Sequence, residues 1–517
     1  MCHVNLYDWT FRHVKFLTMM FAWQCIRVGG GLKMDSMHVV VVGGGITGLT
    51  AAHHLIEWSR REGFPLRCTL LEESQRFGGK IRTYRDEAGL SVELGPDSIF
   101  TPKPAGMQLI GDLGLQERVI YAATNGGTFI SRNGVLHSLP DGMFAAVPAD
   151  LGAFAKTSLI SPAGKLRVLR DLLLPGRPLV DDVALGAFLR SRLGPEFVDN
   201  VASPLLAGIH AGDIDRLSLD AVAPVLRRLY ERYGSLVRGA WMERPRRRPG
   251  ERTPALFASL AGGLEALVDQ LVLYLSERAT LRLGARVLHV RRSHSGCYGL
   301  TVHTNRDEFL LRADAVILAV PSFAAAEILP SVGIHPGLLR SIRYVSTATV
   351  LLAYEYPADV LGLRATGFLI PKGEQSRFSA VTVVSNKWPG SVTERFGAVV
   401  RGYIGRDGYD GWISLSDQEL MEAFASELRS RFGVAAHPVL GKVTRWENAM
   451  PQYEVGHKSR VRQIEHQLEA TPGLVLSGAA YRGMGIPECI DDGRRAADRV
   501  TDFLTSGLVV NRSAVLS

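Results

Sequence analysis

The sequence predicts an α/β fold built on a parallel sheet, with an inserted mixed-sheet domain and a helical domain. Three segments support the parallel sheet: a β-branched run at 39–42 that enters a glycine-rich turn and a helical pattern, and apolar strands at 69–72 and 313–321. Continuous apolar strands are typical of parallel sheets that are covered on both faces. The order of strand, glycine turn, helix and strand indicates a Rossmann-like domain.

The glycine-rich turn has the spacing of a dinucleotide-binding motif. Gly43 allows a tight turn, Gly45 lets a pyrophosphate approach the backbone, and Gly48 lets the helix pack closely on the strand. The helix that follows directs unpaired N–H groups and the positive end of its dipole at a phosphate. Glu72, at the end of the second strand, stands where a ribose-binding carboxylate is expected. The alternative is a glycine loop that only turns the chain.

Three later turns suit a large cofactor. Residues 75–83 contain a paired-glycine turn flanked by basic side chains, and residues 92–98 contain a second turn around Gly95. Glycines permit close backbone approach and the bases can meet phosphate or carboxylate, although hairpin turns with solvated charges are the alternative. At 473–490 a strand again ends in glycines and feeds a helix. A returning strand of this kind closes over the flavin end of a cofactor, so the pattern favours FAD over NAD.

The remaining pattern predicts the domain organisation. Helical spacing occurs at 166–174, 184–193 and 219–229, whereas alternation at 348–356 and 368–384 predicts an antiparallel sheet. We expect an FAD-binding domain at 37–100, 250–335 and 440–505, a substrate-binding domain at 101–140 and 336–439, and a helical domain at 141–249. The helical domain is the candidate for contact with a membrane surface.

Residues 1–36 are expected to be a leader or a misplaced start, outside the fold. Their apolar patch at 16–26 is too short for a bilayer, which needs about 20 apolar residues, and no small-residue cleavage site follows it. Met34 or Met37 is then the natural start.

Composition indicates a large globular protein in a reducing compartment. A length of 517 residues predicts two or three domains. Part of the net charge of +8 lies in a basic run at 244–248, which we expect to be a solvated loop, with contact to an anionic lipid surface as the alternative. No aromatic platform or recognition helix accompanies it, so nucleic acid is not expected as a partner. The five cysteines are scattered and lack CxxC spacing, so no metal site is expected.

From residue 37 onward the chain resembles the oxygen-dependent porphyrinogen oxidases of the Bacillus type, within the amine-oxidase-like flavoproteins. The resemblance rests on residues 43–49, 71–82, 93–98, 203–213, 445–458 and 478–490, of which the last three segments are the most specific. It implies one non-covalent FAD. The residues that it implies for FAD binding are Gly43, Gly44, Gly45, Ile46, Thr47, Gly48, Glu72, Glu73, Lys80, Gly95, Pro96, Asp97, Ser98, Val287, Trp446, Met484, Gly485 and Ile486. For Trp446 a plain core position is the alternative.

The resemblance also implies an activity: oxidation of coproporphyrinogen III to coproporphyrin III, with O₂ as acceptor and H₂O₂ as product. Protoporphyrinogen IX is the alternative substrate. Because the flavin performs the hydride transfer, no catalytic side chain is expected. Lys103 matches a lysine at the substrate site of the Bacillus-type branch, and an exposed lysine is its alternative. A cytoplasmic monomer or homodimer is expected, with at most peripheral membrane contact and a ferrochelatase as downstream partner.

Two other classes stay open at this stage. An amine oxidase often attaches its flavin to a cysteine near the closing motif, but here that region reads Ser477-Gly478-Ala479-Ala480-Tyr481, so amines are disfavoured. A carotenoid-type desaturase and a non-catalytic porphyrin-binding flavoprotein would use the same kind of pocket. Substrate-dependent oxygen consumption separates an enzyme from a carrier.

Overall fold

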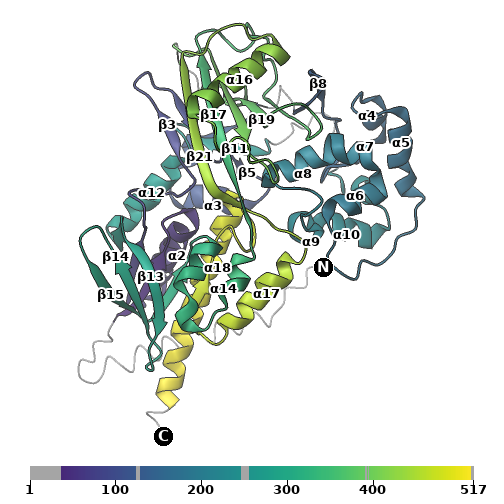
Figure 1. Ribbon diagram of the computed structural model, residues 1–517. Helices are drawn as coiled ribbons and strands as arrows, with labels where there is room; N and C mark the ends of the chain where they lie inside the picture. Colours follow the sequence, from purple (N-terminus) through teal and green to yellow (C-terminus); the bar gives the residue numbers. More distant parts are fainter. Residues whose placement is uncertain (1–35, 124–127, 246–254, 391–392, 394, 514–517) are drawn as a thin grey trace.

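The computed structural model describes residues 36–123, 128–245, 255–390, 393 and 395–513 (Figure 1). All but the last residue of the expected leader lies outside this part of the chain, as do Arg246, Arg247 and Arg248 of the basic run. Among the helices of the described residues, none combines the length and the apolar character that crossing a bilayer requires.

A five-stranded parallel sheet, in the order β12-β2-β1-β16-β22, forms one side of the molecule. Its strands are β1 (Met37–Val42), β2 (Leu66–Leu71), β12 (Thr280–Arg282), β16 (Ala315–Leu318) and β22 (Leu474–Leu476). Every pairing in it is parallel. The expected strands near 39–42, 69–72 and 313–321 are therefore neighbours, and the predicted α/β fold class is confirmed.

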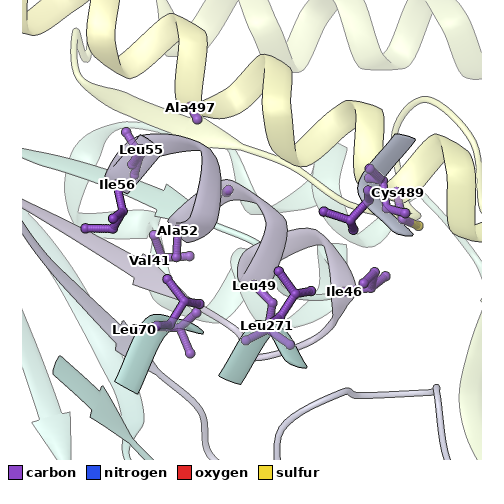
Figure 2. Packing of buried hydrophobic residues seen from close by; sticks show 14 of the residues in the cluster. Val41, Ile46, Leu49, Ala52, Leu55, Ile56, Leu70, Leu271, Cys489 and Ala497 are labelled. Atoms are coloured by element: carbon purple, nitrogen blue, oxygen red, sulfur yellow. The ribbon is translucent and has the colours of Figure 1, made fainter. Parts of the chain in front are cut away.

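Helices cover one face of this sheet. They are α2 (Ile46–Glu62), α12 (Glu265–Ser276) and α18 (Ile486–Ser513). Figure 2 shows Val41 of the sheet, Leu49 of α2, Leu271 of α12 and Ala497 of α18, which belong to one apolar cluster. Each such side chain contributes about 1.5–3 kcal/mol when it is fully buried, so the apolar run of β1 anchors the glycine turn that follows it.

A three-stranded antiparallel sheet covers the opposite face. Its strands are β13 (Arg286–Arg292), β14 (Tyr298–His303) and β15 (Glu308–Ala313). Val287 and Leu300 of this sheet share a core with Val40 and Leu71 of the parallel sheet. Both faces of the parallel strands are thus buried, which explains the continuous apolar runs at 39–42, 315–318 and 474–476, in place of an alternation of apolar and polar residues.

A seven-stranded sheet, in the order β21-β17-β20-β19-β18-β7-β8, forms the upper part of Figure 1. The strands are β7 (Phe129–Arg132), β8 (Val135–Ser138), β17 (Tyr344–Tyr354), β18 (Gly367–Leu369), β19 (Phe378–Val383), β20 (Ala398–Ile404) and β21 (Leu440–Pro451). The expected antiparallel strands near 348–356 and 368–384 are found in it. Because β21 pairs with β17 along most of its length, we propose that the boundary of this unit lies after Pro451 rather than at 440.

The helical region lies to the right of that sheet in Figure 1. It comprises α4 (Leu151–Lys156), α5 (Pro162–Leu169), α6 (Leu185–Leu193), α7 (Pro195–Phe197), α8 (Ser203–His210), α9 (Leu219–Val222), α10 (Pro224–Tyr233) and α11 (Leu236–Glu243). The helical pattern at 219–229 is divided between α9 and α10. Ala223, at φ −134° and ψ 55°, separates them, because a residue before proline disfavours the helical conformation.

Candidate active site

The glycine turn has a different constraint at each of its positions. Gly43 has φ +103°, and a Cβ atom there would lie 2.4 Å from the Ala319 carbonyl oxygen. A Cβ atom on Gly48 would lie 1.9 Å from the Gly43 carbonyl oxygen. A Cβ atom on Gly45 would meet no protein atom within 4 Å. Gly43 and Gly48 therefore serve the packing of the turn, whereas Gly45 leaves open the approach that the expected cofactor needs.

Glu72 closes this end of the site. It directly follows β2, and its two carboxylate oxygens accept the N–H groups of Gly44, at 2.6 Å, and Ser74, at 2.9 Å. These bonds fix the carboxylate beside the first turn of α2, where Ile46 and Thr47 are buried. Its position is compatible with the ribose-binding role that the sequence predicts, which stays a prediction.

The two neighbours expected to bind the cofactor together with Glu72 differ from each other. Glu73 is largely exposed, with its carboxylate 4.0 Å from the Arg286 guanidinium. Val287 is buried next to a β-bulge in β13. The segment leading into β13 lies against the end of β2, because Ala285 donates its N–H to the Glu72 carbonyl at 2.9 Å.

The loop with Gly78 and Gly79 folds back onto the glycine turn. Gly78 donates its N–H to the Gly44 carbonyl at 2.8 Å, and the Cβ position of Gly79 is 3.2 Å from the Gly45 Cα atom. Lys80 at the end of this loop reaches the Ala449 carbonyl with its ammonium at 2.5 Å. The loop thereby links the parallel sheet to the end of β21.

Residues 95–98 form the next wall. The Asp97 carboxylate receives Lys387 and Arg401, each at 2.9 Å, and the Ser98 hydroxyl, also at 2.9 Å. Although burial alone would raise its pKa, the two cations hold the pKa of Asp97 well below its usual range. Arg401 is itself almost fully buried in β20 and donates to the Gly95 carbonyl at 3.2 Å. Asp97 therefore fixes the loop of Gly95 and Pro96, and its charge is already neutralised by protein groups.

Trp446 of β21 lies beside the same loop. Its indole N–H donates to the Leu94 carbonyl at 3.0 Å, and its ring is 3.3 Å from the Cβ position of Gly95. The side chain is only partly buried. A buried hydrogen bond and a partly open ring are what an aromatic wall of a binding site requires.

The segment after β22 brings the start of α18 over the first turn of α2. Asp492 holds it, accepting the Gly478 N–H at 2.7 Å and a guanidinium N–H of Arg482 at 2.9 Å. A Cβ atom on Gly493 would lie 2.4 Å from the Thr47 carbonyl oxygen, so the two helices touch there. Met484, Gly485 and Ile486 form the turn into α18 beside this contact. These three residues therefore lie next to the glycine turn, and their contact with the flavin stays a prediction.

Lys103 occupies the N-cap position of α3 (Pro104–Asp112), without a side-chain hydrogen bond to the helix, and forms an ion pair with Glu488 in the first turn of α18. About half of its side chain is exposed. The predicted substrate lysine therefore lies at the edge of the flavin end, next to Met484–Ile486.

Sequence reasoning missed two groups of residues at the site. Arg401 and Lys387 were not predicted, because only the fold brings the seven-stranded sheet onto residues 95–98. His210 and Tyr453 were quoted only as part of resembling segments, yet their rings lie 5.9 Å apart beside the turn before α18. No spacing in the sequence connects them.

The residues present fit FAD. The open face at Gly45, the fixed carboxylate of Glu72 and the turn at 484–486 come together around the N-terminus of α2, where backbone N–H groups are available to a pyrophosphate. Cys489 is buried, and burial raises the pKa of its thiol to about 11, so this cysteine is held in its unreactive form. In the described ranges there is no grouping of three potential metal ligands.

Three comparisons place these features among known proteins. The family model of flavin-containing amine oxidoreductases matches residues 46–501. The coproporphyrinogen III oxidase of Bacillus subtilis (strain 168) is 35% identical over 476 residues, covering 91% of this chain and 99% of its own length. That of Propionibacterium freudenreichii subsp. freudenreichii is also 35% identical, over 505 residues, covering 91% and 92%. A crystal structure from Exiguobacterium sp. 255-15, provisionally described as a protoporphyrinogen oxidase, superposes with a TM-score of 0.80 at 33% identity, covering 91% of this chain and 100% of its own.

These matches span the parallel sheet, the seven-stranded sheet and the helical region, so they concern the whole architecture and not only its nucleotide-binding motif. The predicted cofactor, FAD, and the predicted class of enzyme, an oxidoreductase, are confirmed by the family. The chain belongs to the flavin-containing amine oxidoreductase family.

Proposed function

We propose that this protein oxidises coproporphyrinogen III to coproporphyrin III, with FAD as cofactor and O₂ as acceptor, and releases H₂O₂ in porphyrin and haem biosynthesis. The observation that carries the proposal is the similarity to the B. subtilis enzyme of that name along 99% of that enzyme's length. A match of this extent includes the seven-stranded sheet and the helical region, which hold the substrate side of the site.

The site assigns different roles to the cofactor and to the protein side chains. When bound, FAD would supply the hydride acceptor for the methylene bridges and the route of electrons to O₂, two electrons in each of three rounds. The glycine turn and Glu72 hold the cofactor, whereas Trp446 and the turn at 484–486 wall its reactive end. The protein orients the macrocycle and excludes water, so the reaction needs few charged groups at its centre.

A cationic hollow supports a substrate with four carboxylates. It has a volume of about 450 Å³, and its wall contains three cations, Lys372, Arg377 and Arg406, and one carboxylate, Glu374. Glu374 pairs with Arg431 at 3.3 Å, and Lys372 pairs with Asp213 at 3.3 Å.

The Arg406 side chain is half-buried and lies 5.8 Å from the centre of the Tyr409 ring, but its guanidinium has no hydrogen bond or ion pair among the described residues, and burial lowers its pKa. The hollow adjoins the end of α8, because Asp407 donates its N–H to the Ala211 carbonyl at 2.8 Å. A buried cation without an anion is costly, and a propionate would supply the anion.

Parallel assays of purified, FAD-loaded protein test the proposal. We expect faster porphyrin fluorescence from coproporphyrinogen III than from protoporphyrinogen IX, with H₂O₂ formed only in air. Preference for protoporphyrinogen IX would transfer the protein to the alternative function, which the description of the Exiguobacterium structure favours. If neither compound reacts faster than the uncatalysed rate, both the proposed function and the alternative function are overturned.

The remaining assignments belong to the same proposal. We propose a cytoplasmic monomer or homodimer with at most peripheral membrane contact, whose product passes to a ferrochelatase. Sedimentation of the purified protein tests the oligomeric state, and its co-flotation with anionic vesicles tests the membrane contact. Transfer of the product to a ferrochelatase that is faster than its release to solvent would support the proposed partner.

A further inference from the structure

His210 stands at a strained point of the backbone beside the site. It is the last residue of α8, and its carbonyl accepts the side-chain amide of Gln452 at 2.9 Å. Ala211, which follows it, has φ +49°, a left-handed conformation that is unusual for a residue other than glycine. Strain of this kind persists where the surrounding structure imposes it, and it is concentrated at functional sites. The surrounding bonds therefore fix the position of the His210 ring.

The His210 ring has an unused hydrogen-bonding nitrogen. Its Nδ1 atom is buried and has no partner among the described residues. The nearest aromatic hydroxyl, that of Tyr453, is already engaged: it donates to the Ala479 carbonyl at 2.6 Å and accepts the Gly483 N–H at 2.8 Å. Leaving a buried polar atom unpaired costs about 1–3 kcal/mol, so such an atom in a binding site is suited to a ligand group.

The surroundings keep the imidazole neutral. Burial, and next the positive charge of Lys103, lower the pKa of His210 to about 4. Titratable groups on adjoining elements include Tyr453, which precedes α17 (His457–Leu468), His457 at the start of α17, Asp407, which donates its N–H to the Ala211 carbonyl, and Glu488 of α18, which pairs with Lys103. At neutral pH the ring therefore carries one N–H donor and one nitrogen lone pair.

We propose that His210 is the catalytic residue that accepts the pyrrole N–H proton of the porphyrinogen. Each round would remove a hydride from a methylene bridge, for which FAD is the acceptor, and one proton. Over three rounds two of these protons come from pyrrole N–H groups, with the imidazole lone pair as their acceptor, and the third comes from the remaining methylene bridge as the macrocycle becomes aromatic. The proton then leaves to solvent, and O₂ takes up the two electrons with two protons to give H₂O₂. The inference rests on the proposed function and adds a base that the sequence analysis did not expect.

Anaerobic stopped-flow measurement of flavin bleaching tests the inference. In the FAD-loaded His210→Asn variant we expect bleaching by coproporphyrinogen III to slow at least about tenfold, because a general base typically contributes 10²–10⁴-fold. FAD content and the rate at which O₂ reoxidises chemically reduced enzyme should stay at the wild-type values. In the wild type, the rate of bleaching should fall as the pH is lowered towards the pKa of His210, because the imidazole becomes protonated. In the variant, this fall in rate at low pH should be absent.

His457→Asn is the matched control. His457 also has a buried Nδ1 atom without a partner among the described residues, but its ring stacks on Tyr453 at 4.1 Å and its Nε2 bonds to the Tyr481 carbonyl at 3.2 Å. Slow bleaching in His210→Asn together with near-normal bleaching in the control supports the proton role. Equal slowing in both variants, or a His210→Asn variant as fast as wild type, would overturn it. Wild-type enzyme that no porphyrinogen bleaches would instead overturn the proposed function.

Discussion

The cofactor side and the substrate side of this molecule hold their ligands in different ways. On the cofactor side, the parallel sheet and the turn at 43–48 present backbone groups, and the constrained positions are glycines. On the proposed substrate side, the side chains on offer are Arg406, which follows β20, and His210, at the end of α8, and these come from distant segments. Backbone recognition leaves a local pattern in the sequence, whereas side-chain recognition becomes visible only when the fold has formed.

Gly48→Ala should have the largest effect. The added Cβ would collide with the Gly43 carbonyl, a backbone atom that has no room to move, so we expect loss of bound flavin and a fall in the free energy of unfolding of about 4 kcal/mol or more. Gly45→Ala is the control, because its Cβ meets no protein atom: the apoprotein should keep its Tm while flavin affinity falls. Flavin absorbance and thermal unfolding measure both effects. A Gly48→Ala protein that stays stable and retains its flavin would contradict the view that backbone packing at the glycine turn holds the cofactor.

The sequence predicts the cofactor side well for the same reason. Gly43, Gly45 and Gly48 are each required by a close approach, and Glu72 is required at the end of a strand, so their spacing is fixed by local geometry. The alternation of strands also predicts much of the seven-stranded sheet. The break between α9 and α10 was hidden because apolar spacing continues across Pro224.

The substrate side is only partly predictable. Lys103 was found through resemblance, and its pairing with Glu488 depends on the contact between α3 and α18. Arg401 lies in an apolar strand, where a lone arginine gives no sign that it reaches Asp97. The left-handed Ala211 that fixes His210 has no signal either, since alanine rarely adopts that conformation.

Arg401→Met tests the junction between the two sides and should give the second largest effect. Removing one member of a buried ion pair typically costs about 3–5 kcal/mol, because the partner charge stays buried. Lys387→Met should cost less, since Arg401 would still neutralise Asp97 and hold the Gly95 carbonyl. Urea unfolding of the two variants measures the difference. Equal losses would show that Arg401 has no special role in joining the sides.

Acid should weaken the substrate side through its buried imidazoles. Burial lowers the pKa of His457 to about 4 from 6.5, so the neutral folded form is favoured above pH 6.5 and this stability is lost as pH falls from 6.5 towards 4. His457→Asn should be less stable than wild type at pH 8, and the gap should narrow by roughly 2–3 kcal/mol by pH 4. Denaturant midpoints across this range measure it. The exposed His466→Asn should follow the wild type, and a gap that stays constant for His457→Asn would contradict the assignment.

Arg406→Gln should have the smallest effect, and we expect it to change only the preference between the two porphyrinogens. If the unpaired Arg406 meets a propionate, its loss should raise the KM for coproporphyrinogen III by about tenfold, equivalent to about 1.4 kcal/mol, with kcat nearly unchanged. Protoporphyrinogen IX has two carboxylates fewer, so its KM should change less. Arg462→Gln on the exposed face of α17 controls for net charge. Equal KM increases for both substrates would mean that Arg406 binds a group common to them, and the cationic hollow would then no longer favour the tetracarboxylate.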